Sequence, residues 1–270
     1  MNKSTVLICL FLFCPFIQVK SEQNLLVTEN ISDGLTCIKD PKDFESSNSF
    51  LLKGNQDVDF LIDAGWSDKV KIPENIRLTI EKSYKVTTHF HFDHIRQWYK
   101  MKNIFLTEQQ YNACEKKSCT PSRWQTIFKI EPFQVSGKLS EIQTEHLNTR
   151  LVTVSCRGHS QTDACFLDKK TRTLFVGDLF YRGPMFHFLP GGNIQKTVET
   201  FQSLLRRDDW DRIALTHGDC SADRASLAMH IEDLSKILQG KLNWTFNLDF
   251  WIPLRAYKVS AGYVLTHLVF

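Results

Sequence analysis

The hexapeptide His89-Phe90-His91-Phe92-Asp93-His94 places three imidazoles and a carboxylate within six residues. Residues 84–88, which precede it, are typical of a β-strand, so side chains two positions apart leave the chain on the same side. His89 and His91 can therefore bind one cation together. Past the strand this alternation ends, and the adjacent Asp93 and His94 can reach a second cation. One loop thus predicts a site for two metal ions.

A site for two metals needs more donors than one loop supplies, and three later segments share one design. Each is an apolar run typical of a strand, followed by glycine beside a potential ligand. Residues 151–154 lead to His159, residues 174–176 to Asp178, and residues 213–216 to His217. Glycine permits a tight turn at the end of a strand. Each segment alone is compatible with an ordinary surface turn, but together with the first loop they predict three further ligands.

With these residues the chain resembles the metallo-β-lactamase fold superfamily, whose members carry H-x-H-x-D-H followed by a histidine, an aspartate and a histidine on successive loops. The resemblance covers nearly the whole chain after its N-terminal segment. It implies an α/β fold, a four-layer αββα sandwich with the metals at one edge of the sheets. It also implies that His89, His91 and His159 hold the first metal. Asp93, His94 and His217 would hold the second, and Asp178 would bridge both.

The resemblance extends to an earlier segment and bears on the metal. Residues 60–65 look like the family's early strand ending in Asp-x-Gly, which makes Asp63 a candidate to orient the ligands. The predicted ligand set contains no cysteine, unlike that of the bacterial lactamases that use a thiolate at the second metal. Imidazole and carboxylate donors suit zinc, and they also accept iron or manganese. We expect two Zn²⁺ ions, because zinc has no redox chemistry to lose in an oxidising compartment.

Two cations that share a water molecule can supply hydroxide at neutral pH, so the predicted activity is hydrolysis. In this hypothesis a metal-bridging hydroxide attacks the carbonyl of a small-molecule acyl substrate. Asp93 would orient this hydroxide, and Asp178 would bridge the two metals that hold it. Residues 88–94, 158–160 and 174–181 are similar to the glyoxalase II branch. They are still more similar to animal metallo-β-lactamase-domain proteins that hydrolyse acyl-coenzyme A thioesters. The resemblance therefore favours a thioester or an ester.

Other activities are open. A lactonase or a ring-opening hydrolase of the β-lactamase type is the main alternative. A phosphodiesterase or nuclease is less favoured, because the chain has no added basic segment for binding nucleic acid. A non-catalytic metal-binding protein is least favoured, since every expected ligand is present. An exported location also fits poorly with coenzyme A, which is mainly intracellular.

The aromatic residues 181–190 follow Asp178 and are candidates for an acyl pocket. Tyr181 would wall it and Arg182 would lie near an anionic group, while His187 would line it without binding metal. A loop that packs on the core explains the same stretch equally well. Relatives usually have glycine after the first metal loop, where this chain has Ile95 and Arg96. We therefore expect Arg96 to crowd the mouth of the pocket.

The N-terminus and the cysteines predict export. Residues 1–21 combine a positive start with a short apolar run, as in a signal peptide, which leaves residues 22–270 as one metallo-β-lactamase-like domain. We expect a secreted protein without a membrane span in its mature form. An even set of cysteines then remains, which predicts disulfides, although their pairing cannot be read from the sequence. The set is Cys37, Cys114, Cys119, Cys156, Cys165 and Cys220.

Some cysteines nevertheless stand in suggestive places. Cys114 and Cys119 are close enough for a local bridge, and Cys156 and Cys165 flank His159. Cys220 is more readily a disulfide partner or a buried thiol than a ligand. Asn30 and Asn243 begin glycosylation triplets.

Composition and periodicity fit a single mixed domain. The net charge is +3 and 42% of residues are hydrophobic, so neither a nucleic-acid partner nor a divided core is indicated. The pattern predicts strands at 49–53, 57–62, 103–106, 163–167, 174–176 and 212–215. It predicts helices at 95–102, from 107 with a capping box, at 194–206 and at 221–238. Residues 261–270 suit a last strand better than a lipid-anchor signal. The oligomeric state is not predicted.

Overall fold

The computed structural model describes residues 25–43, 47–54, 58–114, 118–119, 130–145, 150–249 and 252–268. The predicted signal peptide, residues 1–21, lies outside them. No helix among the described residues is both long and apolar enough to cross a membrane.

The first half of the chain forms a five-stranded sheet in the order β1-β2-β3-β4-β5. Its strands are β1 (Val27–Ser32), β2 (Leu35–Lys39), β3 (Ser49–Leu52), β4 (Phe60–Ile62) and β5 (Tyr84–Val86). All neighbours run antiparallel except β4 and β5, which are parallel. The chain passes between those two strands through α1 (Glu74–Lys82), as a parallel connection requires.

The second half forms another five-stranded sheet in the order β10-β11-β12-β14-β15. Its strands are β10 (Leu151–Val154), β11 (Cys165–Asp168), β12 (Thr173–Phe175), β14 (Arg212–Ala214) and β15 (Ser221–Asp223). Strands β12 and β14 are parallel and are connected through α6 (Ile194–Leu205), whose first turn is capped by the Asn193 side chain. Helix α7 (Arg224–Leu238) follows β15 and is capped by Asp223.

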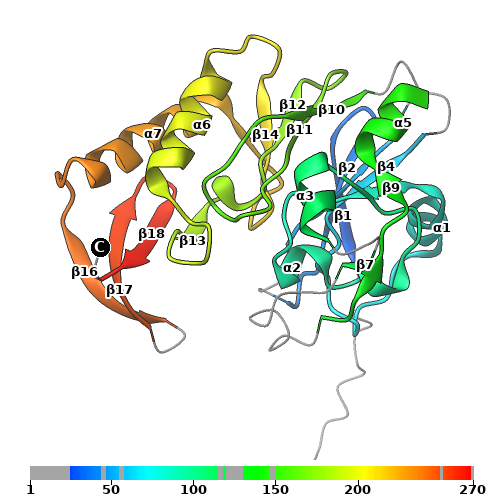
Figure 1. Cartoon of the computed structure of the whole chain (residues 1–270), viewed down its shortest axis with the longest axis horizontal. Coiled ribbons are helices and arrows are strands. Elements are labelled where there is room, and N and C mark those ends of the chain that lie inside the picture. The colour runs from blue at the N-terminus through cyan, green and yellow to red at the C-terminus, as the bar shows by residue number, and fades with distance from the viewer. Residues whose placement is uncertain are drawn as a thin grey trace, which may run out of the picture.

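Alternation along the strands separates three layers of core. Phe50 of β3 and Phe175 of β12 face each other between the sheets, with their ring centroids 5.4 Å apart. Leu51 points the opposite way, into a cluster with residues of α1 and the first metal loop. Leu174 likewise points away from the sheet interface, toward α6 and α7. Helices therefore cover the outer faces of both sheets (Figure 1), and the predicted four-layer sandwich is confirmed.

Short elements connect these layers. They are α2 (Phe92–Ile95), η1 (Trp98–Lys100), β6 (Phe105–Leu106), α3 (Glu108–Ala113), β7 (Ser118–Cys119), β8 (Phe133–Gln134), β9 (Gly137–Lys138), α5 (Leu139–Glu145) and η2 (Gly177–Leu179). The predicted capping box is present at α3, where Thr107 and Gln110 cap each other.

The helix predicted over residues 95–102 is wrong. The chain instead forms α2 and then the separate turn η1. The backbone of Ala64 explains the break, because its N–H donates to the His94 carbonyl at 2.7 Å and its carbonyl accepts from the Gln97 N–H at 3.0 Å. The His94 carbonyl thus bonds to the β4 segment, and the loop is fastened to the first sheet.

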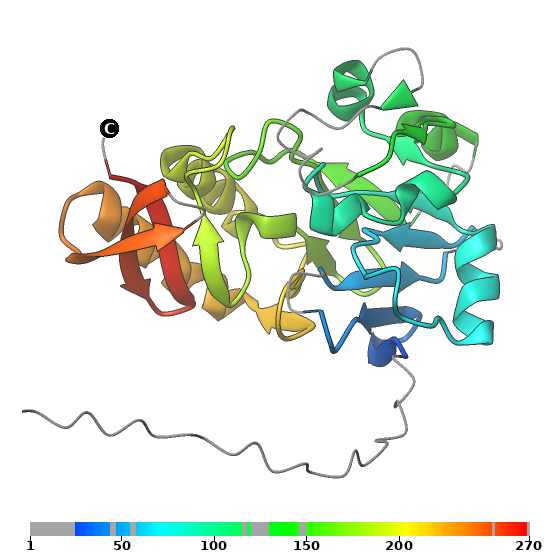
Figure 2. The same cartoon turned by 90° about the horizontal axis from the view of Figure 1, so that it is seen from below.

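The C-terminal residues form a four-stranded sheet in the order β13-β18-β17-β16. Its strands are β13 (Gly183–Phe186), β16 (Trp244–Asp249), β17 (Ile252–Val259) and β18 (Gly262–His267). Strand β18 confirms the predicted last strand, while the rest of this sheet was not predicted. Figure 2 shows strands β16, β17 and β18 of this sheet in orange and red, to one side of the two main sheets.

Three disulfides pair all six cysteines that follow the predicted signal peptide. Cys114–Cys119 closes a local loop, and Cys156–Cys165 brackets the His159 loop. Cys37–Cys220 connects β2 to the segment after His217, across 183 residues of sequence. The predicted even set of disulfides and the local bridge are confirmed.

Candidate metal centre

The predicted ligands come from loops that leave neighbouring strands at one edge of the sandwich. The first metal loop follows β5, His159 follows β10, Asp178 follows β12, and His217 follows β14. Two groups of donors form there, one of His89, His91 and His159, and another of Asp93, His94, Asp178 and His217. Within each group the donor atoms lie within 4.8 Å of one another.

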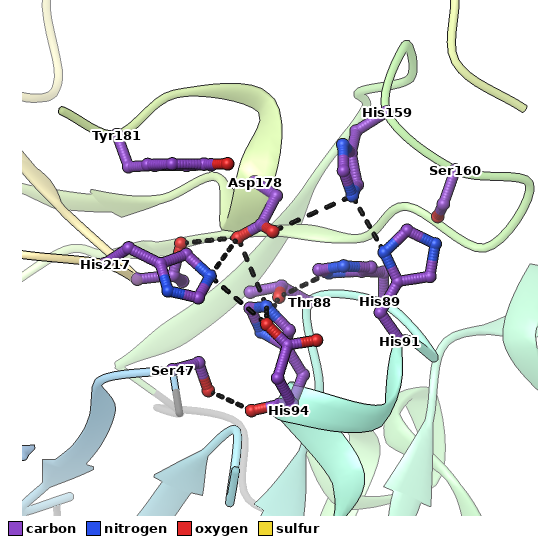
Figure 3. A network of polar contacts seen from close by, with 12 residues as sticks. Ser47, Thr88, His89, His91, His94, His159, Ser160, Asp178, Tyr181 and His217 are labelled. Carbon is purple, nitrogen blue, oxygen red and sulfur yellow. Dashed lines mark hydrogen bonds and ion pairs between the residues drawn. The ribbon is translucent and has the colours of Figure 1, made fainter. Parts of the chain in front are cut away.

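The first group consists of imidazoles alone. His159 Nε2 lies 3.0 Å from His91 Nδ1, and the ring of His89 meets both other rings with centroids 4.5 and 4.7 Å away. Figure 3 shows the three rings converging on one point. Three neutral imidazoles in this arrangement could supply three of the four ligands of a zinc ion.

The second group combines imidazoles with carboxylates. Asp178 Oδ1 lies 3.2 Å from His94 Nε2 and 3.3 Å from His217 Nε2, while Asp93 Oδ2 lies 3.3 Å from His217 Nε2. The other Asp178 oxygen, Oδ2, faces the first group, 3.8 Å from His159 Nε2. Asp178 therefore stands between the two groups (Figure 3), where a bridging carboxylate must lie.

Unpartnered nitrogen atoms support metal binding. His89 Nε2 is buried and has no hydrogen-bond partner among the described residues, and the buried His94 Nε2 has only the ligand carboxylates of Asp93 and Asp178 beside it, without hydrogen-bond geometry. Leaving such an atom without a partner is unfavourable. A cation between these nitrogens and the carboxylates would satisfy them, and the donor set of nitrogen and oxygen fits zinc, iron or manganese.

Electrostatics differ between the two groups. Burial and then the neighbouring imidazoles hold the pKa of His89 and of His159 well below the ordinary value, so both rings are neutral at pH 7. Burial would also lower the pKa of His217, but the carboxylates of Asp178 and Asp93 outweigh it and raise that pKa to about 9. The pKa of His94 is raised for the same reason. The second group therefore holds protons that a metal would displace.

Asp63 orients the first metal loop. Its Oδ2 lies 2.9 Å from His94 Nδ1, which leaves Nε2 of that ring facing the second donor group. Its carboxylate also accepts bonds from the Thr87 and Thr88 hydroxyls and from the Thr88 N–H, at 2.8–2.9 Å. The side chain is fully buried. The structure thus brings Asp63, which the resemblance made a candidate to orient the ligands, into contact with the His94 ring and with the backbone just before the metal loop.

A second buried aspartate, Asp163, holds the His159 loop and was missed by the sequence analysis. Its carboxylate accepts the N–H groups of Gly158, His159 and Ser160 at 2.8–2.9 Å and the Ser160 hydroxyl at 2.6 Å. Gly158 has φ +138°, and a Cβ there would lie 2.2 Å from Thr197 Oγ1. The signal available in the sequence was the spacing Gly-His-Ser-x-x-Asp, in which an acceptor follows a tight turn.

Ser47 and Asn48, which the sequence analysis missed, fix the remaining loops together with Gly65, the glycine of the Asp-x-Gly segment. Ser47 Oγ donates to the Asp93 carbonyl at 2.6 Å, and Asn48 Nδ2 donates to the Leu215 carbonyl at 2.8 Å, next to the His217 loop. A Cβ on Gly65 would lie 1.3 Å from the Asp93 carbonyl oxygen, so only glycine allows this approach. No local pattern identifies Ser47 or Asn48, because each acts on a distant part of the chain.

The predicted pocket residues lie in different places. Tyr181 is buried beside the metal centre, with its ring centroid 4.8 Å from that of His217 and its hydroxyl bonded to the Pro184 carbonyl. Arg182 is exposed and pairs with Asp219 at 2.9 Å. A pair of this kind at the surface contributes little to stability.

Arg96 and His187 lie outside both donor groups. Arg96 pairs with Asp43 and lies over the Phe92 ring, 5.3 Å from its centroid. His187 is buried and lines a separate cavity near the C-terminal sheet. It belongs to neither donor group, so of these four residues the structure brings only Tyr181 to the metal centre.

Known proteins resemble this chain in sequence and in fold. A family model described as the metallo-beta-lactamase superfamily matches residues 43–217, a span that contains all the donors. Acyl-coenzyme A thioesterase MBLAC2 of Gallus gallus is 27% identical over 190 residues, which cover 60% of this chain and 68% of that protein.

Two solved structures share the fold. The metallo-beta-lactamase FIM-1 from Pseudomonas aeruginosa, in a mono-zinc form, has a TM-score of 0.55 at 16% identity. The match covers 80% of this chain and 97% of the FIM-1 chain. TTHA1623 in a di-iron-bound form has a TM-score of 0.50 at 19% identity. The match covers 67% of this chain and 92% of the TTHA1623 chain.

Proposed function

The chain belongs to the metallo-beta-lactamase superfamily and is a metal-dependent hydrolase, and we propose that it hydrolyses acyl thioesters at a centre of two metal ions. The observation that carries this proposal is the position of Asp178. One of its oxygens faces the three-imidazole group and the other faces the second group. That arrangement suits two ions that share a carboxylate and a water molecule.

Each donor group has a distinct part in this proposal. His89, His91 and His159 would hold one ion, while Asp93, His94 and His217 would hold the other. Two ions bound here would polarise a carbonyl oxygen and activate water at neutral pH. Asp93 Oδ2 lies beside both His94 and His217, so this carboxylate can orient the attacking water and accept its proton. Tyr181 packs against the His217 ring.

The substrate class follows from the donor set and from the relatives. The two groups contain no cysteine, so all the donors are imidazole or carboxylate. Acyl-coenzyme A thioesters are the substrates named for the Gallus gallus relative. A thioester carbonyl is also a good match for a centre without a protein nucleophile, because thiolate is a good leaving group. A lactone or a simple ester is the second candidate, favoured by the three disulfides, which suit an oxidising compartment where coenzyme A is scarce.

We propose Zn²⁺ as the metal in both positions. Nitrogen and oxygen donors at these separations bind zinc, iron or manganese, and solved structures of this fold hold zinc or iron. Zinc is favoured because an oxidising environment does not alter its charge. The disulfides are also the support for our proposal that the mature protein is secreted. Asn30 and Asn243, which we propose as glycosylation sites, are both exposed.

The test is hydrolysis by the zinc-loaded protein of six substrates with and without a chelator. The panel holds an acyl-coenzyme A thioester, a glutathione thioester, a simple ester, a lactone, a β-lactam and a phosphodiester. We expect the highest kcat/KM on a thioester, its loss in chelator and its return when Zn²⁺ is added.

Two variants accompany this panel. Asp178→Ala should bind fewer than two metal ions per chain, and its kcat/KM should fall by at least about a hundredfold. Asp33→Asn, an exposed carboxylate paired with Lys170, should change neither. Thioester hydrolysis that survives both the chelator and Asp178→Ala would overturn the proposal. A β-lactam or phosphodiester as the best substrate would overturn the thioester assignment alone.

A further inference from the structure

A second cavity lies apart from the metal centre. It has a volume of about 950 Å³ and lies between the C-terminal sheet, the first turn of α6 and the last turn of α7. Figure 1 shows these elements grouped on the side away from the first sheet. None of the seven metal donors lines the cavity. Its volume falls within the range of cavities that hold small organic ligands.

The walls of this cavity are mainly apolar. Ile194 lies on one side, Ile237 and Leu238 on another, and the rings of Trp244 and Tyr257 on the sheet. Trp244 keeps 44% of its surface exposed, an unusual fraction for so large an apolar side chain. An aliphatic chain in the cavity would cover this surface.

One charged side chain among the described lining residues is the Arg255 guanidinium. No aspartate or glutamate is among the described residues that line the cavity. The Arg255 guanidinium lies over the Trp244 ring, 5.1 Å from its centroid, and so brings a positive charge to the apolar wall. Ile194 and Gln195, in the first turn of the twelve-residue helix α6, line the same space, and a helix N-terminus also favours an anion. At the opposite side, the carbonyls of the last turn of α7 are already hydrogen-bonded, for example Ile237 to the Gly240 N–H at 3.0 Å.

His187 gives an independent indication of a ligand. Its side chain lines the cavity and its residue is 6% exposed. Neither ring nitrogen has a hydrogen-bond partner among the described residues, although the Gly158 backbone lies close enough to act on the pKa of this ring. A buried imidazole without a partner is unfavourable. A polar ligand atom in the cavity would supply one.

We propose that this cavity binds a single-chain amphiphile with an anionic head, either a long-chain carboxylate or its phosphate monoester counterpart. The aliphatic chain lies along Ile194, Ile237, Leu238 and Trp244, and the head is held by Arg255 with the N-terminus of α6. The proposal does not depend on the hydrolase activity, because the site shares no residue with the metal centre.

Calorimetric titration of the delipidated, zinc-loaded protein tests this site. The probes are dodecanoate and dodecyl phosphate below their micelle concentrations, with dodecyltrimethylammonium as the probe of opposite charge. We expect saturable binding of one anionic molecule per chain, at least about tenfold tighter than the cation. A preference between the two anions identifies the head group.

Variants distinguish anion binding in this cavity from anion binding at the metal ions, which also bind carboxylates. Arg255→Ala should lower the affinity for both anions by about tenfold. Leu242→Glu, which places a carboxylate on the cavity lining, should do the same. Arg206→Ala removes an exposed arginine outside the cavity, at the other end of α6, and should change nothing. Thermal unfolding of each variant establishes that it is folded, and Arg255→Gln replaces Arg255→Ala should the latter not fold. Absence of anion binding, or equal binding in the wild type and both cavity variants, would overturn the proposal.

Discussion

At the scale of single residues, three donors of the metal centre are each positioned by a second polar group. Asp63 orients the His94 ring, Asp163 holds the backbone of His159, and the Thr216 hydroxyl donates to Asp178 Oδ1 at 2.8 Å. These supports are buried, so their hydrogen bonds compete little with water. The donors are thereby held in place before a cation arrives, which lowers the free energy cost of assembling the site.

Asp63→Asn should weaken binding of the second metal. Asparagine can turn an N–H toward His94 Nδ1, which removes the acceptor that keeps Nε2 available to the metal. Loss of such a supporting bond typically lowers metal affinity by about 10- to 100-fold. Titration with Zn²⁺ against a competing chelator measures this effect, and Asp33→Asn is the matched surface control. An unchanged affinity for the second ion would show that Asp63 does not set the orientation of His94.

Metal binding should release protons at pH 7. His217, whose pKa is raised to about 9, and His94, whose pKa is also raised, are protonated in the metal-free protein at that pH. Each must lose its proton to bind a cation, so affinity should rise with pH up to about 9 and fall below it. The imidazoles of His89 and His159 are already neutral at pH 7. They add no protons to this count.

Calorimetry in buffers of different ionisation enthalpy counts those protons. We expect release of about one to two protons per chain at pH 7, decreasing toward pH 9. The same heat in every buffer would contradict the raised pKa values.

At the scale of elements, the site depends on loops that leave neighbouring strands. Strands β12 and β14 are parallel, so Asp178 and His217 follow the same ends of adjacent strands. This neighbourhood brings together residues that are far apart in sequence. The metal loop that follows β5 reaches the centre because Gly65 and Ala64 dock directly on its backbone.

The Cys156–Cys165 disulfide should matter for metal binding and not only for stability. It closes a nine-residue separation that contains both His159 and Asp163. In the chain-entropy treatment, replacing both cysteines with serine lowers the free energy of unfolding by about 3 kcal/mol. The same change should weaken binding at the three-imidazole group, because the His159 loop is then less constrained.

Cys114→Ser/Cys119→Ser is the matched control. This disulfide closes a five-residue separation that holds no donor. Its removal should lower stability by about 2 kcal/mol and leave zinc affinity unchanged. Denaturant unfolding and zinc titration of both double variants provide the comparison. Equal zinc affinity in the two would mean that the Cys156–Cys165 bridge acts on stability alone.

At the scale of the whole molecule, the Cys37–Cys220 disulfide joins the two main sheets. Cys37 in β2 and Cys220 after β14 are both buried between the sheets. The bridge closes a separation of 183 residues, and it connects the two halves of the sandwich close to His217. It therefore constrains the relative position of the halves that supply the two ends of the metal centre.

Cys37→Ser/Cys220→Ser should be the most destabilising of the three double variants. For a loop of this length the chain-entropy treatment gives about 5 kcal/mol, which corresponds to a Tm lower by about 10–20 °C. Differential scanning calorimetry of the zinc-loaded variants, all at one scan rate, measures the Tm of each and so ranks their stabilities. A smaller loss of Tm than for Cys114→Ser/Cys119→Ser would contradict this assignment.

The sequence alone determined the local features of this protein. Strand-like runs that end in glycine beside histidine or aspartate marked the donor-bearing loops, and the kinds of side chain in them indicated the metal chemistry. Resemblance to a known family then supplied the order of the layers. The helix expected over residues 95–102 failed because a local pattern carries no information about the Ala64 backbone, which bonds to both sides of the break.

Only the tertiary structure decided which distant residues meet. It paired Cys37 with Cys220, set Asp163 beneath the His159 loop, turned Arg96 toward Asp43 and brought His187 to a cavity between the C-terminal sheet and two helices. Each of these contacts joins side chains or backbone whose closeness depends on how the sheets and helices pack. Such closeness follows from the burial of apolar faces of the whole chain, which no short stretch of sequence encodes.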